Sequence, residues 1–143
     1  MTQADTEIVV RKLGNIKKYL SQLQKKAKLS ESDYVESFEQ QLVVERLLHL
    51  LIESAVDINS HVVVGSGQPP PDTYRDSFLL LGKLGIVPTS LAQKLAPAAG
   101  LRNRLVHDYD DIDVAIVYES MKFAIELFPD YLECVQRYLE NSV

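Results

Sequence analysis

The spacing of apolar residues near the start of the chain constrains the fold more than any other feature of the sequence. Apolar residues return at alternating steps of four and three, at Val9, Leu13, Ile16, Leu20, Leu23 and Ala27. This spacing puts all six on one face of a helix, which we predict over residues 5–28. No later segment alternates apolar and polar residues as a strand does. We therefore expect an all-α fold, an up-and-down bundle of about five helices formed by a single domain over residues 1–143.

Capping residues and a loop divide the first half of the chain. Ser30 and Asp33 resemble a capping box, so a long second helix is predicted from there to about residue 63. The stretch 65–71 contains two glycines and three prolines and cannot continue a helix. We expect a loop there, followed by a short helix whose N-cap is Asp72 or Thr73.

The second half is predicted to contain shorter helices and one long one. Pro88 and Thr89 begin a helix that continues through Leu95. Pro97 and Gly100 then interrupt the chain, which leaves a short helical piece over residues 101–107. The last helix is expected to be capped by Asp110 or Asp111, and to be kinked or broken at Pro129.

Charge is distributed unevenly along this acidic chain. The net charge is −5, yet residues 1–28 carry +5 and the remainder carries −10. The acidic total argues against a protein that coats nucleic acid in general, while a local cationic face remains available for phosphate. The plainer alternative is that the basic residues of the first helix are its solvated side.

Cysteine content and hydropathy indicate a cellular compartment. The single cysteine, Cys134, has no partner for an internal disulfide, which suits a reducing environment. No apolar run was expected to be long enough for a signal segment or a bilayer span. We therefore expect a soluble, cytoplasmic protein without a membrane partner.

The segment 102–109, Arg-Asn-Arg-Leu-Val-His-Asp-Tyr, concentrates the groups needed for chemistry on a phosphate. Metal-independent cleavage of RNA needs a group that moves a proton and a cation that holds the charge developing on the phosphate. His107 and Arg102 supply these two functions and are the candidate catalytic pair. The structural alternative is that the arginines form ion pairs with nearby aspartates while His107 merely ends a helix.

Helical geometry complicates a site built from this segment alone. Residues five apart, such as Arg102 and His107, point about 140° away from each other on a helix. Asn103 shares a face with His107, and Arg104 lies about 60° from it, so both are supporting candidates. Arg102 must either reach around the helix or meet the His107 of a second subunit.

The segment 99–109 resembles a known family nearly residue for residue. It is similar to the run Gly-x-Arg-Asn-x-Leu-Val-His-x-Tyr of HepT-like toxins, a branch of the HEPN superfamily of small helical ribonucleases. Ile112 and Asp113, and the segments 53–59 and 74–78, also stand where the family has similar residues. The resemblance covers most of the chain and implies an all-helical HEPN-like fold.

The resemblance also implies an activity and partners. It implies the toxin of a type VII-like toxin–antitoxin system, a metal-independent endoribonuclease that acts on RNA as a homodimer with a composite active site. Its partner would be an MntA-like minimal nucleotidyltransferase, the antitoxin, which attaches AMP to Tyr109 and so repels the RNA phosphate. An alternative within the same superfamily is a catalytically inactive module that binds nucleotide or docks a nucleotidyltransferase.

Other candidate residues carry weaker signals. Glu53 and Asp57 lie one helical turn apart and are supporting candidates, either holding Arg102 or orienting His107. A structural ion pair is an equally good interpretation of both. The spacing of His49 and His61 fits no metal site, so we expect neither a metal nor a cofactor.

Overall fold

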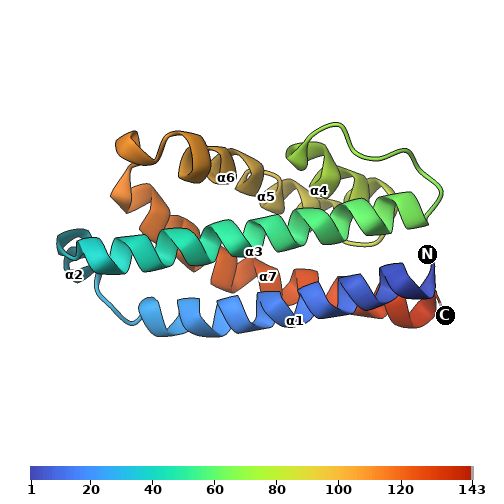
Figure 1. Cartoon of the computed structure of the whole chain (residues 1–143), viewed down its shortest axis with the longest axis horizontal. Coiled ribbons are helices and arrows are strands. Elements are labelled where there is room, and N and C mark those ends of the chain that lie inside the picture. Colours follow the sequence, from blue (N-terminus) through green and yellow to red (C-terminus); the bar gives the residue numbers. More distant parts are fainter. Residues whose placement is uncertain (143) are drawn as a thin grey trace.

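The computed structural model describes residues 1–142, which form seven α-helices and one short 3₁₀ turn and contain no strand. The elements are α1 (Gln3–Lys26), α2 (Glu31–Glu36), α3 (Phe38–Gly65), α4 (Tyr74–Lys83), α5 (Thr89–Leu95), α6 (Ala98–His107), η1 (Tyr109–Asp111) and α7 (Val114–Asn141). In Figure 1, α1 and α3 run in opposite directions, α4, α5 and α6 return together, and α7 runs parallel to α3. The all-α, up-and-down bundle is confirmed, with seven helices in place of about five.

Side-chain caps begin the first two helices. Thr2 Oγ1 accepts a hydrogen bond from the backbone N–H of Asp5 at 3.1 Å, and the Asp5 carboxylate bonds back to the Thr2 N–H. Ser30 similarly accepts from the N–H of Asp33 at 3.1 Å and begins α2, as predicted. The apolar face expected on α1 is buried at Val9, Leu13, Ile16, Leu20 and Leu23.

The single long second helix predicted from the sequence is wrong, because the chain leaves helical geometry at Ser37. This residue has φ −111° and ψ 99°, and its hydroxyl accepts from the N–H of Gln40 at 3.3 Å to cap α3. The Gln41 side chain donates to the carbonyl oxygens of Tyr34 and Val35 at the end of α2. Short side-chain bonds thus satisfy both helix ends at the break.

Two expectations for α7 are also wrong. Its N-cap is Asp113, whose Oδ1 accepts from the N–H groups of Ala115 at 3.0 Å and Ile116 at 3.4 Å, while Asp110 and Asp111 belong to η1. The break predicted at Pro129 is wrong as well, because the helix continues through it to Asn141, while the alternative of a kink there stays a prediction. Pro129 removes one backbone donor, but it lies on the exposed side while its neighbours pack into the core.

Helix α3 is the centre of the bundle and contacts every long helix and most short ones. Among residues 1–142 it is the one helix that is long and apolar enough to cross a bilayer, contrary to the expectation that no run approaches that length. More than half of its most apolar window is buried against the other helices, which is equally typical of the core helix of a soluble bundle.

A buried hydrogen-bond chain joins α7, α3 and α4. The Tyr131 hydroxyl donates to Oδ1 of Asn59 at 2.6 Å and lies 3.1 Å from the carbonyl oxygen of Ala55. Asn59 Nδ2 donates to Ser77 Oγ at 3.1 Å, and Ser77 Oγ donates to the carbonyl oxygen of Tyr74 at 2.7 Å. Complete burial raises the pKa of Tyr131, so its phenol stays a neutral donor. This chain fixes the first turn of α4 against the core.

Replacing Tyr131 by phenylalanine is expected to lower the free energy of unfolding by about 1–3 kcal/mol, because Asn59 then keeps a buried acceptor without its donor. Urea denaturation measures this loss. Tyr138→Phe on the same helix is the matched control, since its hydroxyl has no hydrogen-bond partner within residues 1–142. Equal midpoints for the two variants would contradict the importance of the buried chain.

Candidate functional site

Helix α6 presents two different sides to its surroundings. It begins directly after Pro97, three residues earlier than predicted, and Gly100 lies within it and does not interrupt it. Ala98 and Leu101 face an apolar cavity, whereas Arg102, Asn103 and Arg104 line a groove shared with the start of α4. Arg102 and the supporting candidates Asn103 and Arg104 therefore lie on the polar side of this helix, whereas His107 does not line the groove.

Arg102 is held by groups from two other helices. Its Nε donates to Oε1 of Glu53 on α3, and its guanidinium carbon lies 4.8 Å from the centre of the Tyr74 ring on α4. The Tyr74 hydroxyl in turn donates to Oε2 of Glu53 at 3.4 Å. Nη1 of Arg102 makes only a long contact, 3.5 Å, to Oδ1 of Asn103. The guanidinium is thus oriented from two sides while its outer edge remains free to bind an anion.

The ionic contacts of Glu53 extend along α3 to residues that the sequence did not reveal. His49 Nε2 lies 3.5 Å from Oε1 of Glu53, and Arg46 Nη1 lies 3.2 Å from His49 Nδ1. A guanidinium has only donors, so the contact with Arg46 is a hydrogen bond in the tautomer whose Nδ1 accepts and whose Nε2 carries the proton toward Glu53. The spacing of four between His49 and Glu53 was the only available signal for this contact.

The remaining predicted residues lie apart from this network. Asp57 does not approach Arg102 but pairs with Lys12 on α1, with 2.8 Å between Nζ and Oδ2. His107 is exposed at the last position of α6 and makes no side-chain hydrogen bond or ion pair within residues 1–142. Tyr109 follows in η1 with 64% of its surface exposed. Its phenol is therefore open to a modifying enzyme.

The groove beside Arg102 has a volume of about 680 Å³ and is cationic. Arg75 from α4 and Arg102 and Arg104 from α6 line it, and no carboxylate does. The C-terminal end of α6 leads into an acidic turn that contains Asp108, Asp110, Asp111 and Asp113. An anion approaching α6 is therefore attracted on the groove side and repelled at the turn.

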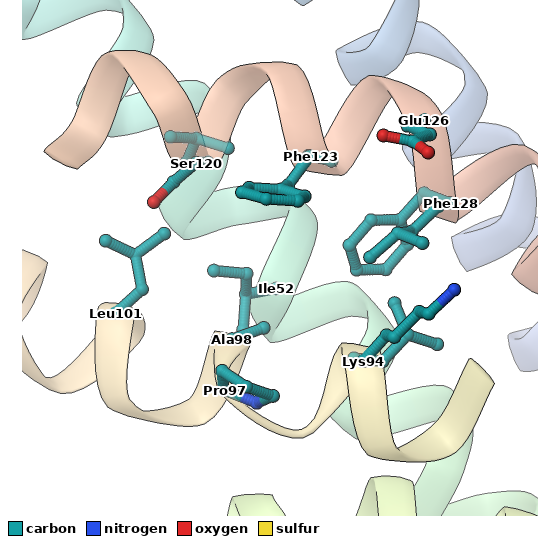
Figure 2. A pocket seen from close by; sticks show the side chains of 13 residues that line it. Ile52, Lys94, Pro97, Ala98, Leu101, Ser120, Phe123, Glu126 and Phe128 are labelled. Carbon is teal, nitrogen blue, oxygen red and sulfur yellow. The ribbon is translucent and has the colours of Figure 1, made fainter. Parts of the chain in front are cut away.

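A second cavity, on the other side of α6, is apolar. It has a volume of about 350 Å³, and Figure 2 shows Ala98, Leu101 and Ile52 opposite Phe123 and Ser120. Lys94, Ser120 and Glu126 are its only polar lining residues. No hydrogen bond pairs a nucleophile with a base among these lining residues, since the Ser120 hydroxyl donates to the carbonyl oxygen of Ile116 at 2.7 Å.

Other reactive groups in the described chain are less suited to chemistry. Within residues 1–142, no three or more His, Cys, Asp or Glu side chains come close enough to hold a metal ion. Burial raises the pKa of the Cys134 thiol on α7, which keeps it protonated. Cys134 is therefore a packing residue of intermediate exposure.

Comparison with known proteins identifies the family. The sequence profile described as "Ribonuclease HepT-like" matches residues 16–136. The chain is 42% identical over 139 residues to the tRNA nuclease HepT of Aphanizomenon flos-aquae, covering 97% of this chain and 95% of that protein. It is 27% identical over 130 residues to the mRNA nuclease HepT of Shewanella oneidensis, covering 91% and 97% of the two chains.

A solved structure agrees with these sequence relatives. The tri-AMPylated HEPN toxin of Shewanella oneidensis, solved in complex with its MNT antitoxin, superposes with a TM-score of 0.83 and 26% identity. The match covers 96% of this chain and 99% of the toxin. Fold and sequence therefore agree, and the chain belongs to the HepT-like ribonuclease family.

Proposed function

We propose that this protein is the toxin of a type VII-like toxin–antitoxin system, a soluble cytoplasmic endoribonuclease that cleaves RNA without a metal ion. The proposal rests on the surroundings of Arg102. Glu53 and Tyr74 orient this side chain, and no carboxylate is among the residues that line its groove. The same helix ends at an exposed histidine, His107. The names of the two nuclease relatives support the same activity.

The two residues divide the work of phosphodiester cleavage. The ribose 2′-hydroxyl gives its proton to solvent as its oxygen attacks phosphorus, and the bond from phosphorus to the 5′-oxygen breaks, which leaves a 2′,3′-cyclic phosphate and a 5′-hydroxyl. Arg102 binds the non-bridging oxygens and stabilises the charge that grows on them. His107 transfers a proton to the leaving 5′-oxygen. Glu53 and Tyr74 act through Arg102 as positioning residues, with Asn103 beside its guanidinium.

A homodimer completes the site in this proposal. Arg102 points toward α3 and α4, whereas His107 projects from the end of α6, five residues further along. Because that spacing separates the two directions by about 140°, one α6 does not aim both side chains at one phosphate. We propose that the Arg102 of one subunit and the His107 of the other meet across a twofold axis.

The nuclease activity is tested with the purified full-length chain and RNA in the presence of a chelator. We expect cleavage by the native protein and none by Arg102→Ala. Absence of cleavage by the native protein, together with retained binding of RNA or nucleotide, would favour the catalytically inactive HEPN module. Equal cleavage by both proteins would point to a contaminating nuclease and contradict the proposal.

An MntA-like nucleotidyltransferase is proposed as the antitoxin, with Tyr109 as the residue that receives AMP. Tyr109 is exposed and directly follows the helix of Arg102 and His107, so AMP attached there adds negative charge beside the groove. The AMPylated toxin of Shewanella oneidensis supports this partner and this modification.

Coexpression with an MntA-like nucleotidyltransferase is expected to increase the intact mass of the chain by whole AMP groups and to abolish RNA cleavage. Tyr109→Phe should keep the mass of the bare chain and retain cleavage, because the phenol oxygen that accepts AMP is gone. Tyr138→Phe is the matched control, since Tyr138 lies on α7 and does not line the groove of Arg102. An unchanged mass of the native chain, or AMP retained on Tyr109→Phe, would contradict the assignment.

A further inference from the structure

Two of the three arginines in the groove have no protein partner. Arg102 is paired with Glu53, but Arg75 and Arg104 are exposed and make no ion pair or side-chain hydrogen bond within residues 1–142. Of the three arginines outside the groove, Arg46 contacts His49 and Arg137 contacts Glu133, while Arg11 stands alone on α1 and is not grouped with other arginines. The groove therefore holds more positive charge than the protein itself neutralises.

The placement of this charge is specific. Arg75 belongs to the first turn of α4 and Arg104 to the last turn of α6, and these segments approach each other only through the packing of the bundle. Three guanidinium groups around one groove repel one another, so an anion bound among them is stabilised. Arg102 accounts for one phosphate, which leaves Arg75 and Arg104 for another.

We propose that Arg75 and Arg104 form a second phosphate subsite, which binds the RNA backbone phosphate next to the one that is cleaved. The inference rests on the proposed nuclease function and adds the path of the strand. The strand lies along the α4 side of α6, because Arg75, Arg102 and Arg104 line the groove there, whereas the C-terminal end of α6 leads into the four aspartates of residues 108–113. Both arginines act as positioning residues and take no part in proton transfer.

The subsite is expected to read the backbone and not the bases. Guanidinium groups bind phosphate oxygens of every nucleotide alike, so these contacts carry no sequence information. One aromatic ring lines the groove, that of Tyr74, and the Arg102 guanidinium already occupies one of its faces. Loss of Arg75 should therefore weaken binding to the same extent for RNAs of different sequence.

The first test compares Arg75→Gln with Arg137→Gln, an exposed arginine on α7 outside the groove. Arg75→Gln is expected to raise KM about tenfold with kcat nearly unchanged. The slope of log(kcat/KM) against the logarithm of the salt concentration should become shallower by about one, because one phosphate contact is lost. Arg137→Gln should leave both unchanged. Thermal unfolding of each variant confirms that the fold is intact, and Arg75→Lys should recover part of the loss.

The second test locates the phosphate with an uncleavable strand. A 2′-O-methyl oligonucleotide carries one neutral methylphosphonate at successive positions, and its binding is measured by fluorescence anisotropy. At the position bound by the subsite, neutralising the phosphate should weaken binding to the native protein but add no further loss in Arg75→Gln. Losses that add at every position would overturn the subsite.

The outcomes separate this inference from the function on which it rests. Binding that depends on Arg75, without RNA cleavage by the native protein, would reject the nuclease and keep the subsite. Cleavage with the same KM in Arg75→Gln and Arg137→Gln would overturn the subsite and keep the nuclease. If Arg75→Gln bound ATP more weakly than the native protein but bound the oligonucleotide equally well, the groove would be assigned to a nucleotide, and this result would also overturn the proposal.

Discussion

Replacing His107 by alanine is expected to lower the rate of RNA cleavage by about 10²–10⁴-fold, the usual contribution of a general acid or base. The loss should appear in single-turnover experiments on a defined RNA, with little change in binding, because Arg102 still holds the phosphate. His107 is exposed and has no bonding partner within residues 1–142, so the substitution should leave the thermal unfolding midpoint nearly unchanged.

His61→Gln provides the matched control for this loss. His61 lies on α3 and its Nδ1 is 3.4 Å from Oδ1 of Asp5, in a region that shares no lining residue with the groove of Arg102. We expect this variant to cleave RNA at the native rate. Cleavage by His107→Ala within about threefold of the native rate would remove His107 from the proton transfer.

The sequence predicted helices well where local chemistry decides and poorly where several residues compete. The apolar stripe of α1 and the start of α5 at Thr89 are confirmed. The break at Ser37 was missed because its neighbours are acceptable in a helix, although Ser37 and Gln40 have the spacing of a capping box. Four aspartates precede α7, and the choice of Asp113 depends on where η1 ends.

The candidate site shows the same division. Arg102, His107 and Tyr109 lie within eight residues, so their pattern is visible in the sequence. The ring of Tyr74 beside Arg102 depends on how α4 packs against α6, which no spacing along the chain reveals. Glu53 and Asp57 were equivalent by sequence, one turn apart. In the structure Asp57 forms an ion pair with Lys12 on α1, and Glu53 forms the ion pair with Arg102.

The proposed composite site predicts an unusual result when two inactive subunits are combined. A heterodimer of Arg102→Ala and His107→Ala, isolated with two affinity tags, contains one site with both native residues and one with neither. It is expected to recover about half of the native activity, although each variant alone is inactive. A site formed within one subunit predicts no activity, because each subunit of this heterodimer lacks one of the two residues.

The reciprocal heterodimer tests the same geometry in the opposite direction. A native subunit paired with the double variant Arg102→Ala/His107→Ala leaves each composite site with one residue missing, so no activity is expected. If both residues act within one subunit, this pair instead retains about half of the native activity. The two heterodimers contain the same four side chains in total and differ only in which subunit carries them. Their opposite activities would therefore depend on the arrangement of the site alone, since folding, charge and protein concentration are matched. A monomer by light scattering, with full cleavage activity, would exclude the composite site outright.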